Sequence, residues 1–358
     1  MANIDLTFPL GNFHADRWGS LWSENGVILP FGNAQKLTAI RLEPSTAKAL
    51  AAGLSLEIRQ REEAHGAIWS EHADKVGAMN DSCLFGASLN LPPEERCEFP
   101  TGNSLAFSLY LLVRNLPLNG YEQSFKMLPG SLLSDRFLTG IACSNIAMED
   151  VKFIAESLVT PAAFASAISQ DWHDASFFHI GFEQGQQSAS YKLYLEFPKG
   201  KCKPLYVGYK WNPEDHTQQT ITHYSQPEPA KLSRLLEKVA SVYEKSDEKL
   251  TALVQKIIVL AADKCTDSGT AEALLLVEVR EQNTPRYSFD INLYESNLRV
   301  SDLAQILEEL REYFGIAESE FEKIMTRTRD HLAGHLSGGI DRHGNAFLTL
   351  YHARMTAD

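Results

Sequence analysis

The chain has 358 residues, of which 44% are hydrophobic and 10% aromatic, so it can bury a sizeable core as one large domain or two ordinary ones. Its formal net charge of −13 argues against a nucleic-acid-binding protein, because neutralising phosphates requires a basic surface. A local cationic pocket for a small anion is compatible with this charge.

The cysteines are odd in number and show no Cys-x-x-Cys spacing, which is typical of reduced intracellular thiols rather than a disulfide framework. They are Cys83, Cys97, Cys143, Cys202 and Cys265. The first residues lack a basic region followed by an apolar run, and no apolar stretch approaches the ~18 residues of a membrane helix. We therefore expect a cytoplasmic protein that binds neither membranes nor nucleic acids.

The first half of the chain gives weak patterns. Residues 1–45 alternate Gly, Pro and Trp with short apolar pieces, which predicts an irregular N-terminal segment packed on a core. Over 104–113, apolar residues recur at every second position, which predicts a strand. The further expectations are helices at 44–53, 148–157 and 161–170, and strands at 54–61, 84–91 and 177–182.

The strongest pattern is a hairpin of two strands, 191–197 and 205–211, joined by the turn Pro198–Lys201. One face of the hairpin is apolar and carries Tyr191, Leu193, Leu195, Phe197, Leu205, Val207, Tyr209 and Trp211. The other face is polar and aromatic and carries Lys192, Tyr194, Glu196, Tyr206, Gly208 and Lys210. The function depends on whether this second face contacts solvent or an enclosed chamber.

From residue 228 onward, pairs of helices with i, i+3, i+4 apolar spacing alternate with strands. The expected helices are 228–244, 246–264, 300–314 and 318–333, and the expected strands are 273–280, 286–294 and 345–352. This is an internal repeat of roughly 80 residues without a linker. We therefore expect a single domain over residues 1–358.

Hairpin-linked strands are antiparallel, and each helix pair must cover an apolar face. The opposite faces interleave tyrosines with charged and amide groups. Besides the hairpin residues, they carry Glu278, Arg280, Arg286, Ser288, Asp290, Asn292, Tyr294, Asn345, Thr349 and Tyr351. This composition favours an α+β fold in which helix pairs surround a closed antiparallel β-barrel, with these faces lining its lumen. The alternative is an open sheet with a solvated face.

Three stretches carry a family resemblance. Residues 179–201 contain a strand ending in Lys-x-Tyr followed by Pro and a basic turn, 289–294 read Phe-Asp-Ile-Asn-Leu-Tyr, and 340–351 end in a strand with a tyrosine. Together they resemble the aromatic prenyltransferases of the ABBA barrel, built from helix-strand-strand-helix repeats around a substrate-binding lumen. The likeness covers roughly residues 170–352 and, loosely, 80–115.

The resemblance implies transfer of a prenyl group from an allylic diphosphate to an aromatic acceptor, both of them small molecules. Cationic groups would hold the departing diphosphate, and aromatic rings would shield the carbocation from water. The implied diphosphate ligands are Lys192, Lys210, Arg280 and Arg286, and the implied shield is Tyr194, Tyr206, Tyr294 and Tyr351. No cofactor is implied, except Mg²⁺ where a carboxylate faces the diphosphate.

The chain also departs from this family. Indole-prenylating members show Arg-x-Lys-x-Tyr where this chain has Asp290-x-Asn292-x-Tyr294, an expected arginine falls near Ala106, and an expected glutamate has no equivalent around 86–90. Two alternatives therefore stay open. One is a barrel that has lost the diphosphate site and binds a small molecule or a peptide. The other is a different enzyme that uses Glu183, Asp290 or His179 as acid–base groups.

His331 and His335 are spaced as two ligands on one helix face, which suggests a metal site. However, the Glu of His-Glu-x-x-His is missing, and glycines surround His335. The segment is better interpreted as the end of the helix predicted at 318–333.

Overall fold

The computed structural model describes residues 21–23, 26–33, 36–42, 104–113, 116–199, 203–226, 228–229, 231–243, 247–267, 274–282, 284 and 287–354. The helix predicted at 44–53 and the strands predicted at 54–61 and 84–91 lie outside these residues. The contacts between Cα atoms divide the chain into two compact units, Met1–Asp74 and Lys75–Asp358. We describe each unit by itself, and the single domain over 1–358 stays a prediction.

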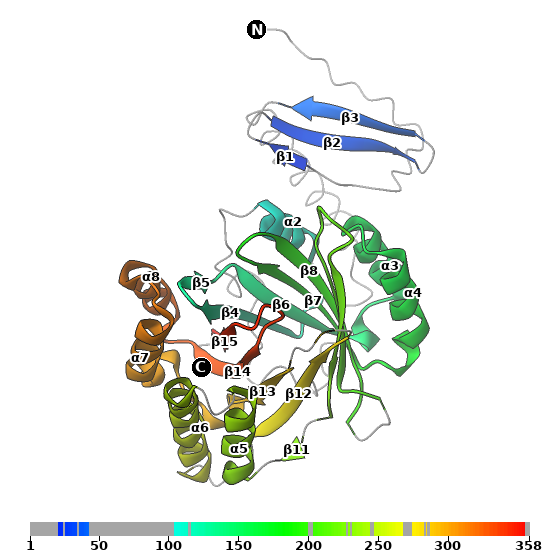
Figure 1. The fold of residues 1–358 in the computed structure, drawn as a ribbon. Helices are drawn as coiled ribbons and strands as arrows, with labels where there is room; N and C mark the ends of the chain where they lie inside the picture. The colour runs from blue at the N-terminus through cyan, green and yellow to red at the C-terminus, as the bar shows by residue number, and fades with distance from the viewer. Residues whose placement is uncertain are drawn as a thin grey trace, which may run out of the picture. The chain divides into compact units, whose positions relative to one another are not determined.

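The first unit contains a small antiparallel sheet, coloured blue in Figure 1. Its strands, in sheet order, are β1 Leu21–Ser23, β2 Gly26–Asn33 and β3 Lys36–Leu42. These strands lie within the segment 1–45, so the prediction of irregular structure is wrong for them. The reason is that short alternating stretches such as Lys36–Leu42 pair with one another despite the glycines and prolines between them.

The second unit is built on a closed β-barrel. Neighbouring strands are antiparallel, and β10 pairs with β12 as well as with β9, which closes the ring. In ring order the strands are β10 Gln219–Tyr224, β9 Tyr206–Trp211, β8 Ala189–Glu196, β7 Phe177–Gln184, β6 Arg136–Ala142, β4 Gly120–Leu128, β15 Ala346–Ala353, β14 Leu332–Ile340, β13 Tyr287–Asn292 and β12 Leu275–Glu281. Two short strands pair outside the ring, β5 Ser131–Leu133 with β4 and β11 Glu228–Pro229 with β12. A closed ring leaves no unpaired strand edge, so the predicted barrel is confirmed.

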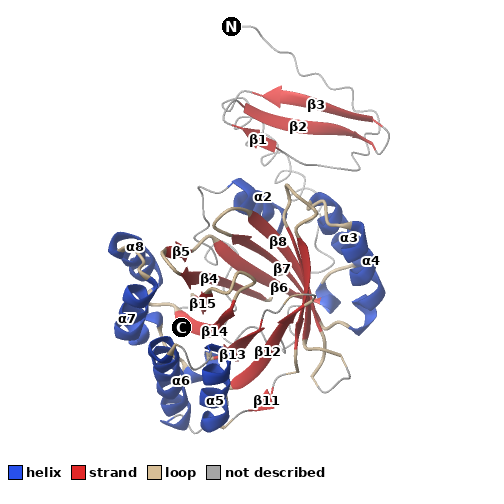
Figure 2. Cartoon of the chain, viewed as in Figure 1, coloured by secondary structure: helices blue, strands red, loops and turns tan. Residues whose placement is uncertain are grey.

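Helices lie on the outside of the ring (Figure 2). α2 Ser104–Val113, α3 Met148–Ser157 and α4 Ala162–Asp171 share an apolar core with the outer faces of β6 to β9. α5 Leu232–Tyr243, α6 Glu248–Asp267, α7 Ala304–Phe314 and α8 Glu318–Thr328 share a second core with β4 and β12 to β15. The apolar cores therefore lie between the sheet and the helices, which leaves the inner face of the sheet for polar residues. Among the described helices, none has both the length and the apolar character needed to cross a bilayer.

Two predicted elements are wrong. Residues 104–113 form helix α2, in which the buried Ala106, Leu109 and Val113 share a face at helical spacing. The segment is apolar nearly throughout, so alternation cannot separate the two periods. The helix predicted at 318–333 ends at Thr328, and the segment beyond it is strand β14. Its glycines serve strand packing rather than a helix cap, because a Cβ on Gly339 would lie 2.6 Å from the carbonyl oxygen of Tyr287 on β13.

Val159, just after α3, has a left-handed backbone with φ of 51°, which β-branched residues rarely adopt. Its side chain is 62% exposed, so little packing opposes its removal. We expect Val159→Gly to raise the free energy of unfolding by about 1 kcal/mol, since glycine adopts this conformation without a steric cost. Urea denaturation measures the change. Val259→Gly on α6 is the control and should destabilise by a few tenths to about 1 kcal/mol; equal losses in both variants would contradict the expectation.

Candidate active site in the barrel lumen

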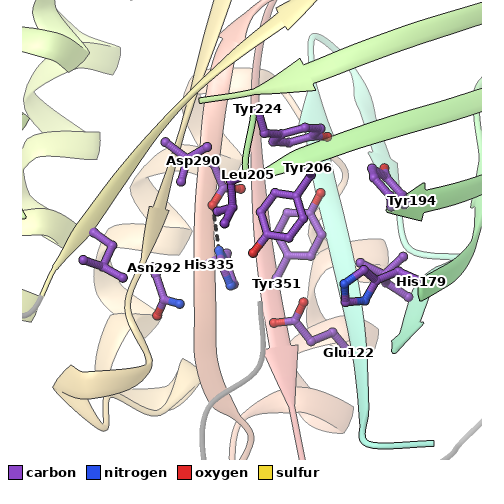
Figure 3. A pocket seen from close by; sticks show the side chains of 13 residues that line it. Glu122, His179, Tyr194, Leu205, Tyr206, Tyr224, Asp290, Asn292, His335 and Tyr351 are labelled. Atoms are coloured by element: carbon purple, nitrogen blue, oxygen red, sulfur yellow. Dashed lines mark hydrogen bonds and ion pairs between the residues drawn. The ribbon is translucent and has the colours of Figure 1, made fainter. Parts of the chain in front are cut away.

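Side chains from most strands of the barrel meet in an enclosed cavity (Figure 3). With the lining side chains as they stand, the cavity holds only a few water molecules, so a prenyl donor and an aromatic acceptor enter it only if lining side chains move. Its lining residues are Glu122, Leu138, His179, Tyr194, Leu205, Tyr206, Tyr224, Leu275, Val277, Asp290, Asn292, His335 and Tyr351. The polar-aromatic face of the predicted hairpin therefore faces the lumen, whereas Leu193, Leu195 and Trp211 pack against helices.

A cationic cluster adjoins this cavity. Arg136 on β6, Lys192 on β8 and Lys210 on β9 all contact the carboxylate of Glu183 on β7. Arg136 Nη1 lies 3.1 Å and Lys210 Nζ 2.5 Å from its oxygens. Burial opposes ionisation of Glu183, but these three cations, together with the nearby Lys126, outweigh it and hold the pKa of this carboxyl well below its usual range. Burial also lowers the pKa of Lys192 to about 7, in spite of the attraction of Glu183.

Next to this cluster, tyrosines form an aromatic wall. The rings of Tyr206 and Tyr224 meet edge to face with centroids 5.5 Å apart, and those of Tyr194 and Tyr224 at 6.0 Å. Tyr194 lies directly over Gly208, where a Cβ would come within 2.5 Å of the ring. Glycine at this position therefore lets the Tyr194 ring lie flat along the barrel wall, and the π faces form a surface suited to a cation.

The cavity also holds acid–base groups. Asp290 Oδ1 lies 2.6 Å from His335 Nδ1, the pair joined by the dashed line in Figure 3. His179 Nε2 pairs with Glu196 Oε2 at 2.8 Å. These are two carboxylate–imidazole pairs in one lumen, an arrangement that orients a ring nitrogen for proton transfer.

Glu122 on β4 is the third acid–base group. The Tyr294 hydroxyl donates to its Oε1 at 2.5 Å, whereas its buried Oε2 has no hydrogen-bond partner among the described residues. Burial raises the pKa of Glu122 to about 7, against the opposing effects of His335 and the Tyr294 hydrogen bond. A carboxyl with this pKa can gain or lose a proton near neutral pH.

The structure brings most of the predicted site residues together. The lumen positions are occupied by Glu183, Lys192, Tyr194, Tyr206, Lys210, Asp290, Asn292 and Tyr351, and Tyr294 joins them through Glu122. Arg286 lies outside the described residues.

The prediction that Arg280 lies in the lumen as a diphosphate ligand is wrong. Its side chain is 74% exposed, and its neighbour on the same face, Glu278, bonds Lys238 of the outer helix α5. The lumen face of β12 carries Leu275 and Val277 instead. Here the apolar face of the strand, with Leu275 and Val277, faces the lumen, and the face with Glu278 and Arg280 faces outward, so the charged face was assigned to the lumen wrongly.

The site also contains residues that the sequence reading missed. Arg136, Glu122, Tyr224 and His335 lie on β6, β4, β10 and β14, strands that were not predicted. A signal existed on β4, whose outward Tyr121, Phe125 and Met127 alternate with Glu122, Ser124 and Lys126. His335 on β14 also lies on a strand and not on a helix face with His331, so the spacing argument for a metal site fails.

No family model matches the sequence, and no curated protein matches it either. Similar solved structures include the NotF prenyltransferase, with a TM-score of 0.44 and 11% sequence identity over 66% of this chain and 81% of that chain. NotF in complex with brevianamide F and DMSPP gives a TM-score of 0.41 and 9% identity over 66% of this chain and 80% of that chain. We therefore take the function from the chain's own residues.

Proposed function

We propose that the chain transfers a prenyl group from an allylic diphosphate to an aromatic acceptor inside the barrel. The observation that carries this proposal is the meeting of Arg136, Lys192 and Lys210 on one carboxylate, on the strand faces that also carry the lumen residues Leu138, Tyr194 and Tyr206. Such a cluster stabilises the negative charge that develops when a diphosphate departs. The cluster comes from β6, β8 and β9, so it does not need the basic residues that the chain lacks at Asp290 and Asn292.

The remaining groups suit the rest of the reaction. The allylic C–O bond breaks with its electron pair leaving on the diphosphate, and the tyrosine wall attracts the carbocation. The acceptor ring then forms the new C–C bond and loses a proton from the same carbon. Glu122 and the Asp290–His335 pair line the cavity and can take this proton. Mg²⁺ is not required by this arrangement, because Asp290 pairs with His335 and not with the cationic cluster.

A second candidate is an acid–base enzyme without a diphosphate substrate. The two carboxylate–imidazole pairs in one lumen favour it. Transfer of a prenyl group distinguishes the two, because only the first candidate consumes an allylic diphosphate.

The test measures binding first and product second. Dimethylallyl, geranyl and farnesyl diphosphates, with and without Mg²⁺, should raise the melting temperature. A donor at a free concentration of about 100 times its Kd stabilises the folded state by about 2.7 kcal/mol. A donor that binds is then incubated with indoles, phenols and naphthols, and prenylated products are identified by mass. Binding without product would favour a binding barrel, and no binding of any donor would contradict the proposal.

We expect Lys192→Ala to abolish the donor-induced shift with little change in the melting temperature of the free protein near pH 8. Lys192 is close to half neutral already at pH 7, because its pKa is about 7, so the variant removes little native charge pairing above that pH. Arg280→Ala is the control, since this side chain lies on the exterior. An unchanged shift in Lys192→Ala would remove Lys192 from the site.

A further inference from the structure

The Glu183 carboxylate sits where three cationic side chains converge. Its side chain is only 12% exposed, and the partners Arg136 and Lys192 are 6% and 13% exposed. Charge-assisted contacts in such a protected place are stronger than on a surface. The Glu183 carboxylate therefore occupies a buried anion-binding site and does not form an exposed surface ion pair.

The strand register shows that this position requires an anion. Lys192 is directly opposite Lys210 across the β8–β9 pair, and like charges at opposed positions repel. On its other side, Lys192 is opposite Gly181, which has no side chain. The wall thus places two lysines side by side, and Glu183 supplies the negative charge that both of them contact.

One carboxylate is a poor match for this cluster in charge. Arg136, Lys192 and Lys210 bring three positive charges when all are protonated, against one negative charge. Burial together with Arg136 and Lys210 keeps the pKa of Lys192 at about 7 although Glu183 touches it. A phosphate group carries close to two negative charges and several strong acceptor oxygens, so it matches the cluster better.

We propose that Glu183 is an internal stand-in for phosphate, and that a phosphate- or diphosphate-bearing ligand binds the lumen by displacing its carboxylate from Arg136, Lys192 and Lys210. This inference rests on the cationic cluster assigned under the proposed function. Glu183 is the last residue but one of β7, next to the turn over 185–188, so its side chain can rotate away without breaking the strand ladder. In the wild type, Glu183 therefore occupies the cationic cluster, and a ligand must compete with its covalently attached carboxylate.

Inorganic pyrophosphate is the probe, because it contains the anion without a prenyl chain. Its dissociation constant is measured by calorimetric titration of the full chain in EDTA and again with Mg²⁺. We expect Glu183→Gln to bind pyrophosphate at least about tenfold more tightly than the wild type in EDTA, while its melting temperature without ligand falls. Glu278→Gln is the matched control, because it also removes a carboxylate bonded to a buried lysine, Lys238, but outside the barrel; its affinity should equal that of the wild type.

If Glu183→Gln binds pyrophosphate as tightly as the wild type or more weakly, the inference is overturned. It is also overturned if Mg²⁺ strengthens pyrophosphate binding in the wild type and not in Glu183→Gln, because Glu183 would then be a metal ligand. If Glu183→Gln does not fold, Glu183→Asp withdraws the carboxylate by one methylene and should bind pyrophosphate more tightly than the wild type. The two proposals fail separately. Tighter pyrophosphate binding without any prenylated product would leave the stand-in role and remove the prenyl transfer, and product formation without tighter binding would do the reverse.

Discussion

Replacing Arg136 with glutamine is expected to lower kcat/KM for the allylic diphosphate by about 100- to 1000-fold, the usual loss when one donor to a developing oxyanion is removed. Arg136 is the most buried cation of the cluster, held by a hydrogen bond of 3.1 Å from its Nε to Ser124 Oγ. A buried, fixed guanidinium needs no reorganisation when the diphosphate departs. Release of diphosphate and formation of prenylated product, measured side by side, give the rate.

The same substitution also affects stability, and a second variant separates the two effects. Arg136→Gln removes one of the three cations that hold Glu183, so the free energy of unfolding should fall by about 2–3 kcal/mol. Adding Glu183→Gln removes the carboxylate and should restore part of that loss without restoring the rate. Arg280→Gln should change neither quantity, because Arg280 lies on the exterior. A double variant with wild-type rate would show that Arg136 acts through Glu183 and not on the substrate.

Sequence patterns predicted the site where one face of a strand is apolar and the other is not. β8 and β9 satisfy this condition, because helices cover Leu193 and Tyr209 while Lys192 and Tyr206 face the lumen. A period of two then tells inside from outside. The barrel and a large part of its polar lining follow from these two strands and their repeats.

The pattern failed where the apolar face of a strand faces the lumen or where the chemistry comes from a distant strand. On β12, the apolar Leu275 and Val277 line the lumen, whereas Arg280 shares the outward face with Leu276, so the assumption that the apolar face packs on helices placed Arg280 on the wrong side. Arg136 and Glu183 lie far apart in sequence, and only the antiparallel register of β6 and β7 places them opposite each other. Closure of the ring by β10 and β12 is likewise a tertiary pairing with no local signal.

We compare the free energy of unfolding of Glu122→Gln with that of the wild type at two pH values. The variant minus wild-type difference is expected to be about 2–3 kcal/mol more favourable at about pH 8 than at about pH 5. Burial raises the pKa of Glu122 from 4.5 to about 7 in the folded state. The folded chain therefore holds a proton on Glu122 that the unfolded chain has released, and the stability that this provides is lost as the pH rises toward 7. Glutamine carries no charge at either pH, and its amide oxygen can still accept the Tyr294 hydroxyl.

The measurement is the free energy of unfolding of wild type and variant at both pH values. Titrating groups that do not interact with Glu122, such as the His331–His352 pair, change equally in the two proteins and cancel in the difference. Glu281→Gln is the contrasting variant, because Glu281 is also buried but pairs with Arg342 at 2.9 Å, so its loss should destabilise at pH 8. A difference between wild type and Glu122→Gln that stays constant with pH would mean that the pKa of Glu122 is not raised. Glu122 would then be a weaker base than the proton transfer proposed for it calls for.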